Sequence, residues 1–124
     1  MKDIVLTNRA PAPIGPYSQA VKVGKLLFLS GQSPLDPATG TLAKGIAAET
    51  KQVFENLKAV LEAAGSSLDN ALKTTVYMTN LSEFAEMNKV YESYFTGKPP
   101  ARSTVQVSAL PRGVSVEIDL IAEA

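Results

Sequence analysis

The spacing of apolar residues changes several times along the chain, and each change predicts a new element. Residues 46–64 place apolar side chains three and four positions apart, which is the spacing of an amphipathic helix. Gly65 follows directly and is suited to end that helix. A second helix is expected to begin at Asn80 or Ser82, whose side chains can cap a helix, and to run to about Phe95.

Six other segments alternate apolar and polar residues or are rich in strand-forming types. They cover residues 2–7, 18–23, 26–29, 71–79, 103–109 and 114–122. Gly24-Lys25 predicts a hairpin between the second and third strands. The last two strands are expected to form another hairpin through Pro111-Arg112-Gly113, which would place Glu117 closer to Gln106 than to Arg102.

This order of elements predicts an α+β fold, with two helices packed on one face of a six-stranded mixed sheet. A chain of 124 residues is long enough for one domain with a single core, so we expect one domain over residues 1–124. In the last strand, the face turned away from the helices would carry Ser115, Glu117, Asp119 and Ile121. This face is only partly polar, and we interpret it as an interface between subunits.

The composition excludes several kinds of chemistry. The chain has no cysteine and no histidine, so it lacks a thiol nucleophile, a disulfide framework and the commonest general base and metal ligand. Twelve basic residues balance twelve acidic ones, which argues against broad electrostatic binding of nucleic acid or anionic membrane. No phosphate loop or dinucleotide fingerprint is present, so we expect neither a cofactor nor a metal. No leader-like or membrane-spanning apolar run is found, so a cytoplasmic protein is expected.

Two charged residues are the main candidates for chemistry. Arg102 follows a stiff proline pair, and its planar guanidinium matches a carboxylate in a two-pronged contact. Glu117 stands between two apolar residues, so its carboxyl group is expected to be partly buried and able to orient or deprotonate a water molecule. Structural roles remain open for both: a surface ion pair for Arg102, and an anchor at a subunit interface for Glu117.

Three further positions carry weaker signals. Tyr17 follows Gly15-Pro16, so a rigid loop delivers its ring, although many tyrosines only pack over a sheet. Ser30-Gly31 ends a strand at a glycine, where the backbone can approach a ligand closely or simply leave the sheet. Asn88 is the polar exception on the inward face of the second helix, and a helix-capping or interface role would also explain it.

Several motifs together resemble one known family. Pro100-Ala101-Arg102-Ser103, followed by Val116-Glu117-Ile118, resembles the signature of the RidA (YjgF/YER057c/UK114) family. Other segments resemble that family's motifs in the same order; they are residues 12–20, 30–32, 75–77 and 87–95. The resemblance covers essentially the whole chain.

The resemblance implies a chorismate mutase-like fold assembled as a homotrimer, with ligand sites in the clefts between subunits. It also implies a 2-iminobutanoate/2-iminopropanoate deaminase, which hydrolyses reactive 2-imino acids from pyridoxal-phosphate dehydratases to 2-keto acids and ammonia. By motif, Arg102 would hold the substrate carboxylate and Glu117 the attacking water. Tyr17 would close the site from a neighbouring chain, and backbone groups at Gly31 and Thr104 would contact the substrate.

Ser30 and Asn88 are further substrate-binding positions implied by the resemblance. Many members of the family have a cysteine where this chain has Thr104, so a thiol takes no part in the mechanism here. Two alternatives remain open. One is an endoribonuclease or translation inhibitor, against which the zero net charge and the absence of histidine count. The other is a non-catalytic module that binds small carboxylates, in which Arg102 would serve equally well.

Overall fold

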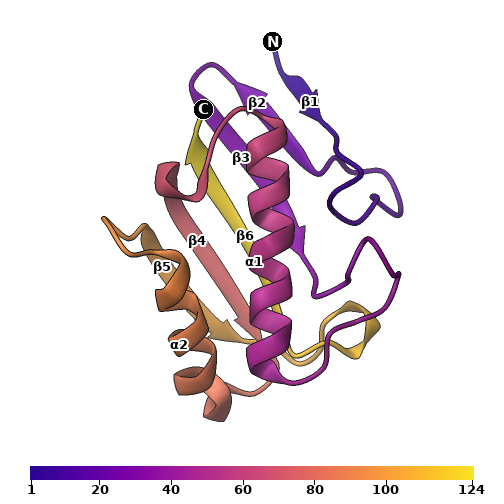
Figure 1. Cartoon of the computed structure of the whole chain (residues 1–124), viewed down its shortest axis with the longest axis vertical. Helices are drawn as coiled ribbons and strands as arrows, with labels where there is room; N and C mark the ends of the chain where they lie inside the picture. The colour runs from indigo at the N-terminus through magenta and orange to yellow at the C-terminus, as the bar shows by residue number, and fades with distance from the viewer.

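The six strands form one mixed sheet in the order β1-β2-β3-β6-β4-β5 (Figure 1). Their bounds are β1 Asp3–Val5, β2 Ala20–Val23, β3 Leu26–Gln32, β4 Ala71–Met78, β5 Ala101–Gln106 and β6 Val116–Glu123. All 124 residues are described by this computed structural model. Neighbouring strands run antiparallel except β4 and β5, which are parallel. The predicted hairpin at Gly24 is confirmed, because Val23 pairs with Leu26.

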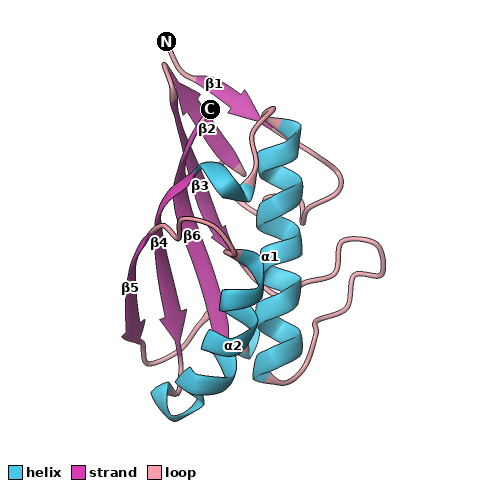
Figure 2. Cartoon of the chain, turned by 60° about the vertical axis from the view of Figure 1, so that its left-hand side comes forward, coloured by secondary structure: helices cyan, strands magenta, loops and turns pink.

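Two α-helices, α1 (Ile46–Ala63) and α2 (Phe84–Tyr94), cover one face of this sheet (Figure 2). The predicted α+β architecture is therefore confirmed. Gly65 ends α1 as expected: its φ is +80°, and the N–H groups of Gly65 and Ser66 donate to the carbonyls of Glu62 and Leu61 at 3.0 and 2.8 Å. The start of the second helix differs from the prediction, because Asn80 caps a short 3-10 turn, Leu81–Glu83, and α2 begins only at Phe84.

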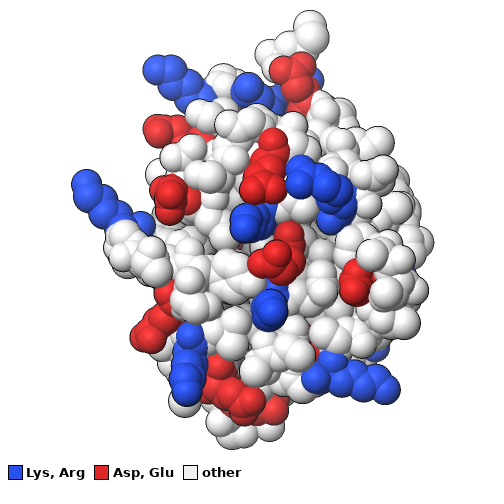
Figure 3. Space-filling model, in the orientation of Figure 1, with Lys and Arg blue, Asp and Glu red and all other residues white.

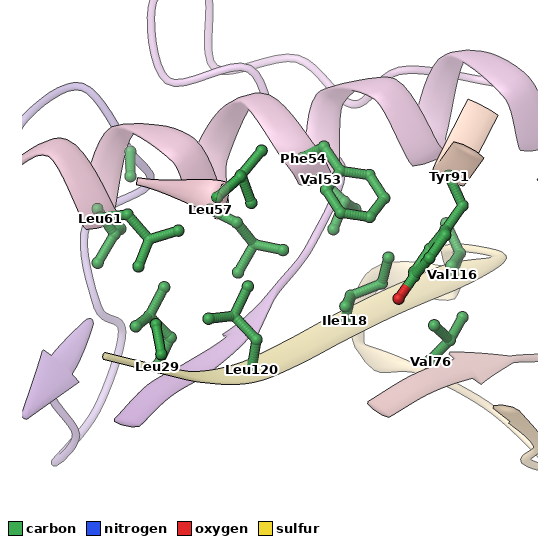
Figure 4. Packing of buried hydrophobic residues seen from close by; sticks show 14 of the residues in the cluster. Leu29, Val53, Phe54, Leu57, Leu61, Val76, Tyr91, Val116, Ile118 and Leu120 are labelled. Carbon is green, nitrogen blue, oxygen red and sulfur yellow. The ribbon is translucent and has the colours of Figure 1, made fainter. Parts of the chain in front are cut away.

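The core lies between the helices and the central strands (Figure 4). Val53, Phe54 and Leu57 of α1 are fully buried against Ile118 and its neighbours on β6. The alternation predicted for the last strand is confirmed, since every second side chain of β6 from Val116 onward points into this core. Buried apolar alternation of this kind fixes which face of the strand meets the helices.

The predicted hairpin between the last two strands is wrong. β5 pairs only with β4, at the edge of the sheet, whereas β6 lies in the interior between β3 and β4. The physical reason is that α2 carries the chain from β4 to β5, and a helical crossover places two strands side by side in parallel. Glu117 consequently pairs with Tyr77 of β4, and neither Gln106 nor Arg102 is its neighbour across the sheet.

The opposite face of the sheet carries no helix. Ile4, Val21, Phe28 and Ile121 lie in one row across β1, β2, β3 and β6, because each pairs with the next in the strand register. Phe28 is 41% exposed and Ile4 56% exposed. An apolar row therefore remains accessible to solvent on the open face of this chain. Neither helix has the length and apolar character needed to cross a lipid bilayer.

Candidate active site

Glu117 lies at the centre of the sheet, where a bulge in β3 makes room for it. The register of β3 against β6 shifts between Leu29 and Gln32, so that Ser30 and Gly31 form the irregular segment. A Cβ atom built on Gly31 would overlap the Glu117 carboxylate and would lie 2.9 Å from its Cδ. The sequence uses glycine here because the carboxyl group occupies the space of a side chain.

A cleft of about 480 Å³ opens beside this carboxyl group. Tyr17, Ser30, Gly31 and Glu117 all line it, so the structure brings four of the predicted residues together. Tyr17 is 52% exposed, and its hydroxyl oxygen accepts from the Ile14 N–H at 3.4 Å. The Ser30 hydroxyl donates to the Ser18 carbonyl at 2.6 Å, which joins the bulge to the loop that carries Tyr17.

The loop that forms one wall of the cleft is held by a single buried amide. The Gln19 side chain is 1% exposed; its nitrogen donates to the carbonyls of Thr7 and Pro11 at 3.0 and 2.9 Å. Its oxygen accepts from the Thr7 N–H at 2.7 Å. Gln19 therefore fixes the proline-rich segment, which can form few backbone hydrogen bonds of its own.

The surroundings of Glu117 favour its protonated form. Burial raises the pKa of Glu117, and the negative charge of Asp119 raises it further. Asp119 lies two residues along β6 on the same face, and it accepts a hydrogen bond from the Tyr77 hydroxyl at 3.1 Å. A raised pKa makes the Glu117 carboxylate a stronger base than that of an ordinary glutamate, which suits a group that takes a proton from water.

Arg102 occupies a second site, at the edge strand β5. Its Nη1 donates to the Asn88 side-chain oxygen at 2.7 Å, and its Cζ lies 4.6 Å from the centroid of the Tyr91 ring and 5.3 Å from that of Phe84. The only ion pair between side chains in the structure joins Arg9 to a glutamate elsewhere. Arg102 is thus an exposed cation held by neutral groups.

The two sites lie on opposite faces of the sheet. Arg102 pairs with Thr74, a fully buried residue on the helix side, and contacts α2. Glu117 pairs with Tyr77, whose strand neighbours Val76 and Met78 point to the core, so Glu117 faces away from the helices. Thr104, two residues beyond Arg102, shares its face. The structure therefore brings Arg102, Asn88 and Thr104 to one place and the other candidates to another, and does not join them within one chain.

Three residues near these sites had not been predicted to take part. Asp119 shares the face of Glu117, and the period of two along the strand was the available signal. Tyr91 lies under Arg102, although its spacing in the helix indicated only a core residue. Arg112 lines the cleft from a turn in which its φ is +65°, and no sequence signal pointed to it. No group of three or more histidine, cysteine, aspartate or glutamate side chains could hold a metal ion.

Comparison with known proteins gives a consistent result. The family model described as Endoribonuclease L-PSP matches residues 7–124. The chain is 54% identical to a RutC family protein of Pyrococcus horikoshii, over 98% of each chain. It is 46% identical to the 2-iminobutanoate/2-iminopropanoate deaminase of Mus musculus, over 98% of this chain and 91% of that protein.

A solved structure agrees with the fold. The crystal structure of E. coli TdcF with bound serine has a TM-score of 0.95 and 42% identity, and the match covers 98% of each chain. The matched family model and the relatives at this level of identity span nearly the full length. The chain belongs to the Endoribonuclease L-PSP family, also called the RidA (YjgF/YER057c/UK114) family.

Proposed function

We propose that this protein is a deaminase that hydrolyses 2-imino acids to 2-keto acids and ammonia, and that it acts in the cytoplasm beside the dehydratases that release such imines. The observation that carries the proposal is the exposed Arg102 guanidinium, which is held by neutral groups and has no anionic partner. A fixed cation of this kind is suited to a small carboxylate. The deaminase name of the mouse relative supports the same reaction.

The proposed site needs two chains. Arg102, Asn88 and Thr104 lie on the helix side, whereas Glu117 and Tyr17 lie at the cleft beside the open face. We propose a homotrimer in which Arg102 of one subunit faces the Glu117 cleft of its neighbour. The uncovered apolar row that includes Phe28 supports burial of the open face between copies of the chain.

The chemistry then balances without a cofactor. Arg102 binds the carboxylate of the 2-imino acid, with backbone groups at Gly31 and Thr104 lining the path to the imine carbon. A water molecule adds its oxygen to that carbon while Glu117 accepts one of its protons and passes it to the imine nitrogen, which gives an adduct with a hydroxyl and an amino group on one carbon. The hydroxyl then loses its proton to Glu117 as the carbonyl forms, the carbon–nitrogen bond breaks, and that proton passes to the departing nitrogen, so that a keto acid and ammonia remain. Such imines also hydrolyse in plain water, so orientation and proton transfer through one carboxyl group would supply a sufficient acceleration.

The test is a coupled assay with a threonine dehydratase, in which formation of the 2-keto acid is followed with and without this protein. We expect acceleration that is lost in Arg102→Ala. Arg9→Ala is the matched control, because Arg9 is an exposed arginine that pairs with Glu62 and neither lines the cleft nor contacts Arg102. No acceleration over buffer would overturn the deaminase, and binding of 2-ketobutyrate without turnover would favour a carboxylate-binding module.

A second assay tests the assembly from two chains. Arg102→Ala and Glu117→Ala are each expected to be inactive alone. After mixed refolding in equal amounts, random association would leave about a quarter of the sites with both native halves. Recovered activity near that fraction supports a shared site, whereas no recovery in verified mixed oligomers contradicts it.

The description of the family model favours one other candidate, an endoribonuclease. The protein has zero net charge, and acidic and basic side chains are interleaved on its helix-bearing face (Figure 3). Ribonuclease A-type catalysis by histidine is impossible in this chain. RNA cleavage by the highly purified protein that disappears in Glu117→Ala would favour the nuclease over the deaminase.

A further inference from the structure

We propose that Tyr91 is the positioning residue of Arg102: its ring face holds the guanidinium in place, while the Thr74 hydroxyl fixes the ring. The inference rests on the proposed function in one respect, namely that Arg102 receives the carboxylate of the ligand. Tyr91 would touch neither the ligand nor the reacting atoms.

The contacts of Arg102 leave its positive charge without an anionic partner. Its Cζ lies 4.6 Å above the Tyr91 ring, and one of its five N–H groups is used by the Asn88 oxygen at 2.7 Å. An aromatic face attracts a cation without neutralising it, whereas a carboxylate partner would occupy the fork that the ligand needs. The tyrosine therefore orders the guanidinium and leaves donors free for an incoming anion.

The ring itself has little freedom to move. Tyr91 is 5% exposed, and its hydroxyl is hydrogen-bonded at 2.7 Å to that of Thr74, which is fully buried. Phe54 packs edge-on against the ring at 5.4 Å, and Phe95 lies at 4.9 Å. These contacts clamp the ring from the core side and leave one face for the guanidinium.

The pairing of β4 with β5 also connects Thr74 to Arg102. Thr74 on β4 is the direct partner of Arg102 on β5. Thr74 thus sets the backbone position of Arg102 through the sheet and the position of the Tyr91 ring through its hydroxyl. Thr74 therefore helps to position both the backbone and the guanidinium of Arg102. A binding group is pre-organised when its supporting residues are fixed in this way.

A purely structural role for Tyr91 predicts different results from a positioning role. Tyr91→Leu keeps an apolar core residue and removes the aromatic face, whereas Tyr91→Phe keeps the face and removes only the hydroxyl. Tyr94→Leu is the matched control, because it removes a ring that stacks on Phe54 in the same cluster and that pairs with neither Tyr91 nor Arg102. If Tyr91→Leu does not fold, Tyr91→Met, which also fills space without a ring, takes its place.

The first readout is ligand binding, measured as KM in the coupled assay and as the calorimetric Kd of 2-ketobutyrate. We expect Tyr91→Leu to raise both on the order of tenfold with little change in kcat, and Tyr91→Phe to restore most of the loss. Tyr94→Leu should lower the melting temperature and leave KM unchanged. Equal KM effects in Tyr91→Leu and Tyr94→Leu, or no rescue by Tyr91→Phe, would overturn the proposal.

The second readout needs no ligand and separates this inference from the deaminase itself. In the NMR spectrum of the free protein, the Arg102 side-chain protons should carry a ring-current shift that Tyr91→Phe keeps and that Tyr91→Leu reduces to the part due to the more distant Phe84 ring. A wild-type protein that binds the keto acid without turnover would refute the deaminase and leave the binding test of Tyr91 in force. A wild-type protein that shows neither the shift nor binding would refute the positioning role.

Discussion

Gly31→Ala should damage the site through one defined contact. Gly31 does not require a positive φ, so alanine is permitted by the backbone at this position. The new Cβ would lie 2.9 Å from Cδ and 3.1 Å from Cγ of Glu117. Because the carboxyl group already fills that space, the Glu117 side chain must move.

The size of the movement sets the expected effect. Carbon atoms in ordinary contact are about 3.5–4.0 Å apart, so Cδ has to withdraw by about 0.6 Å or more, and the carboxylate oxygen by more still. A displacement approaching 1 Å at a catalytic group can reduce kcat by about 10²-fold. The cleft beside Glu117 can accept the displaced group, so we expect a loss of stability of only about 1 kcal/mol.

The assay is kcat for 2-keto acid formation, with the melting temperature measured on the same samples. Gly97→Ala is the matched control, because Gly97 also lacks a positive φ and a Cβ there would meet nothing within 4 Å. Glu117→Ala is expected to be inactive, so in that background the comparison uses the melting temperature, which Gly31→Ala should leave unchanged because the overlapping carboxyl group is gone. Full activity of a folded Gly31→Ala protein, or an equal loss of melting temperature in both backgrounds, would refute the contact between this Cβ and the Glu117 carboxyl group.

Four other outcomes are expected. Burial is the main cause of the raised pKa of Glu117, and the negative charge of Asp119 is the second. Asp119→Asn removes that charge, so the limb of the pH–rate profile due to Glu117 should move to lower pH. The folded protein holds the Glu117 proton more tightly than the unfolded chain does, because the pKa of Glu117 is raised on folding. The free energy of unfolding should therefore fall as the pH rises from the ordinary glutamate pKa through the raised one. Urea midpoints measured across this range should fall less in Glu117→Gln than in the wild type. Phe28→Asp, on the open face, should shift the protein to monomers in light-scattering chromatography and abolish turnover, and an active monomer would contradict the shared site. Gln19→Leu leaves the loop carbonyls and the Thr7 N–H without their partner and should reduce the free energy of unfolding by about 2–4 kcal/mol in urea titration, whereas a change below about 0.5 kcal/mol would contradict its role in the loop.

The elements and the core could be predicted from the sequence because the burial of alternate side chains appears as a pattern of apolar and polar residues over short stretches. Val116, Ile118 and Leu120 alternate with polar residues, and all three are buried against the helices. Gly65 ends a helix because the chain must take a positive φ there. Each of these features depends on residues close together in the chain.

Strand order depends on residues far apart, and the expected last hairpin shows the difference. Alternation specifies which face of a strand is buried but does not identify the neighbouring strand. One signal in the sequence nevertheless opposed that hairpin, because a helix between β4 and β5 indicates a parallel crossover. The expected strand bounds left only residues 110–113 between the last two strands, whereas the structure has a longer connection over residues 107–115.

Arg102 and Glu117 lie on opposite faces of the sheet because of the β4 residues with which they pair. On β4, Thr74 pairs with Arg102 and Tyr77 pairs with Glu117; these two positions differ by an odd number, so the side chains point to opposite faces. No choice of rotamers can join them within one chain. An internal ion pair would occupy the guanidinium and would lower the pKa of Glu117, whose burial and neighbour now raise it. Placement on opposite faces therefore keeps an unpaired cation and a carboxyl group with a raised pKa in the same chain, and association of subunits is the step that can bring them to one substrate.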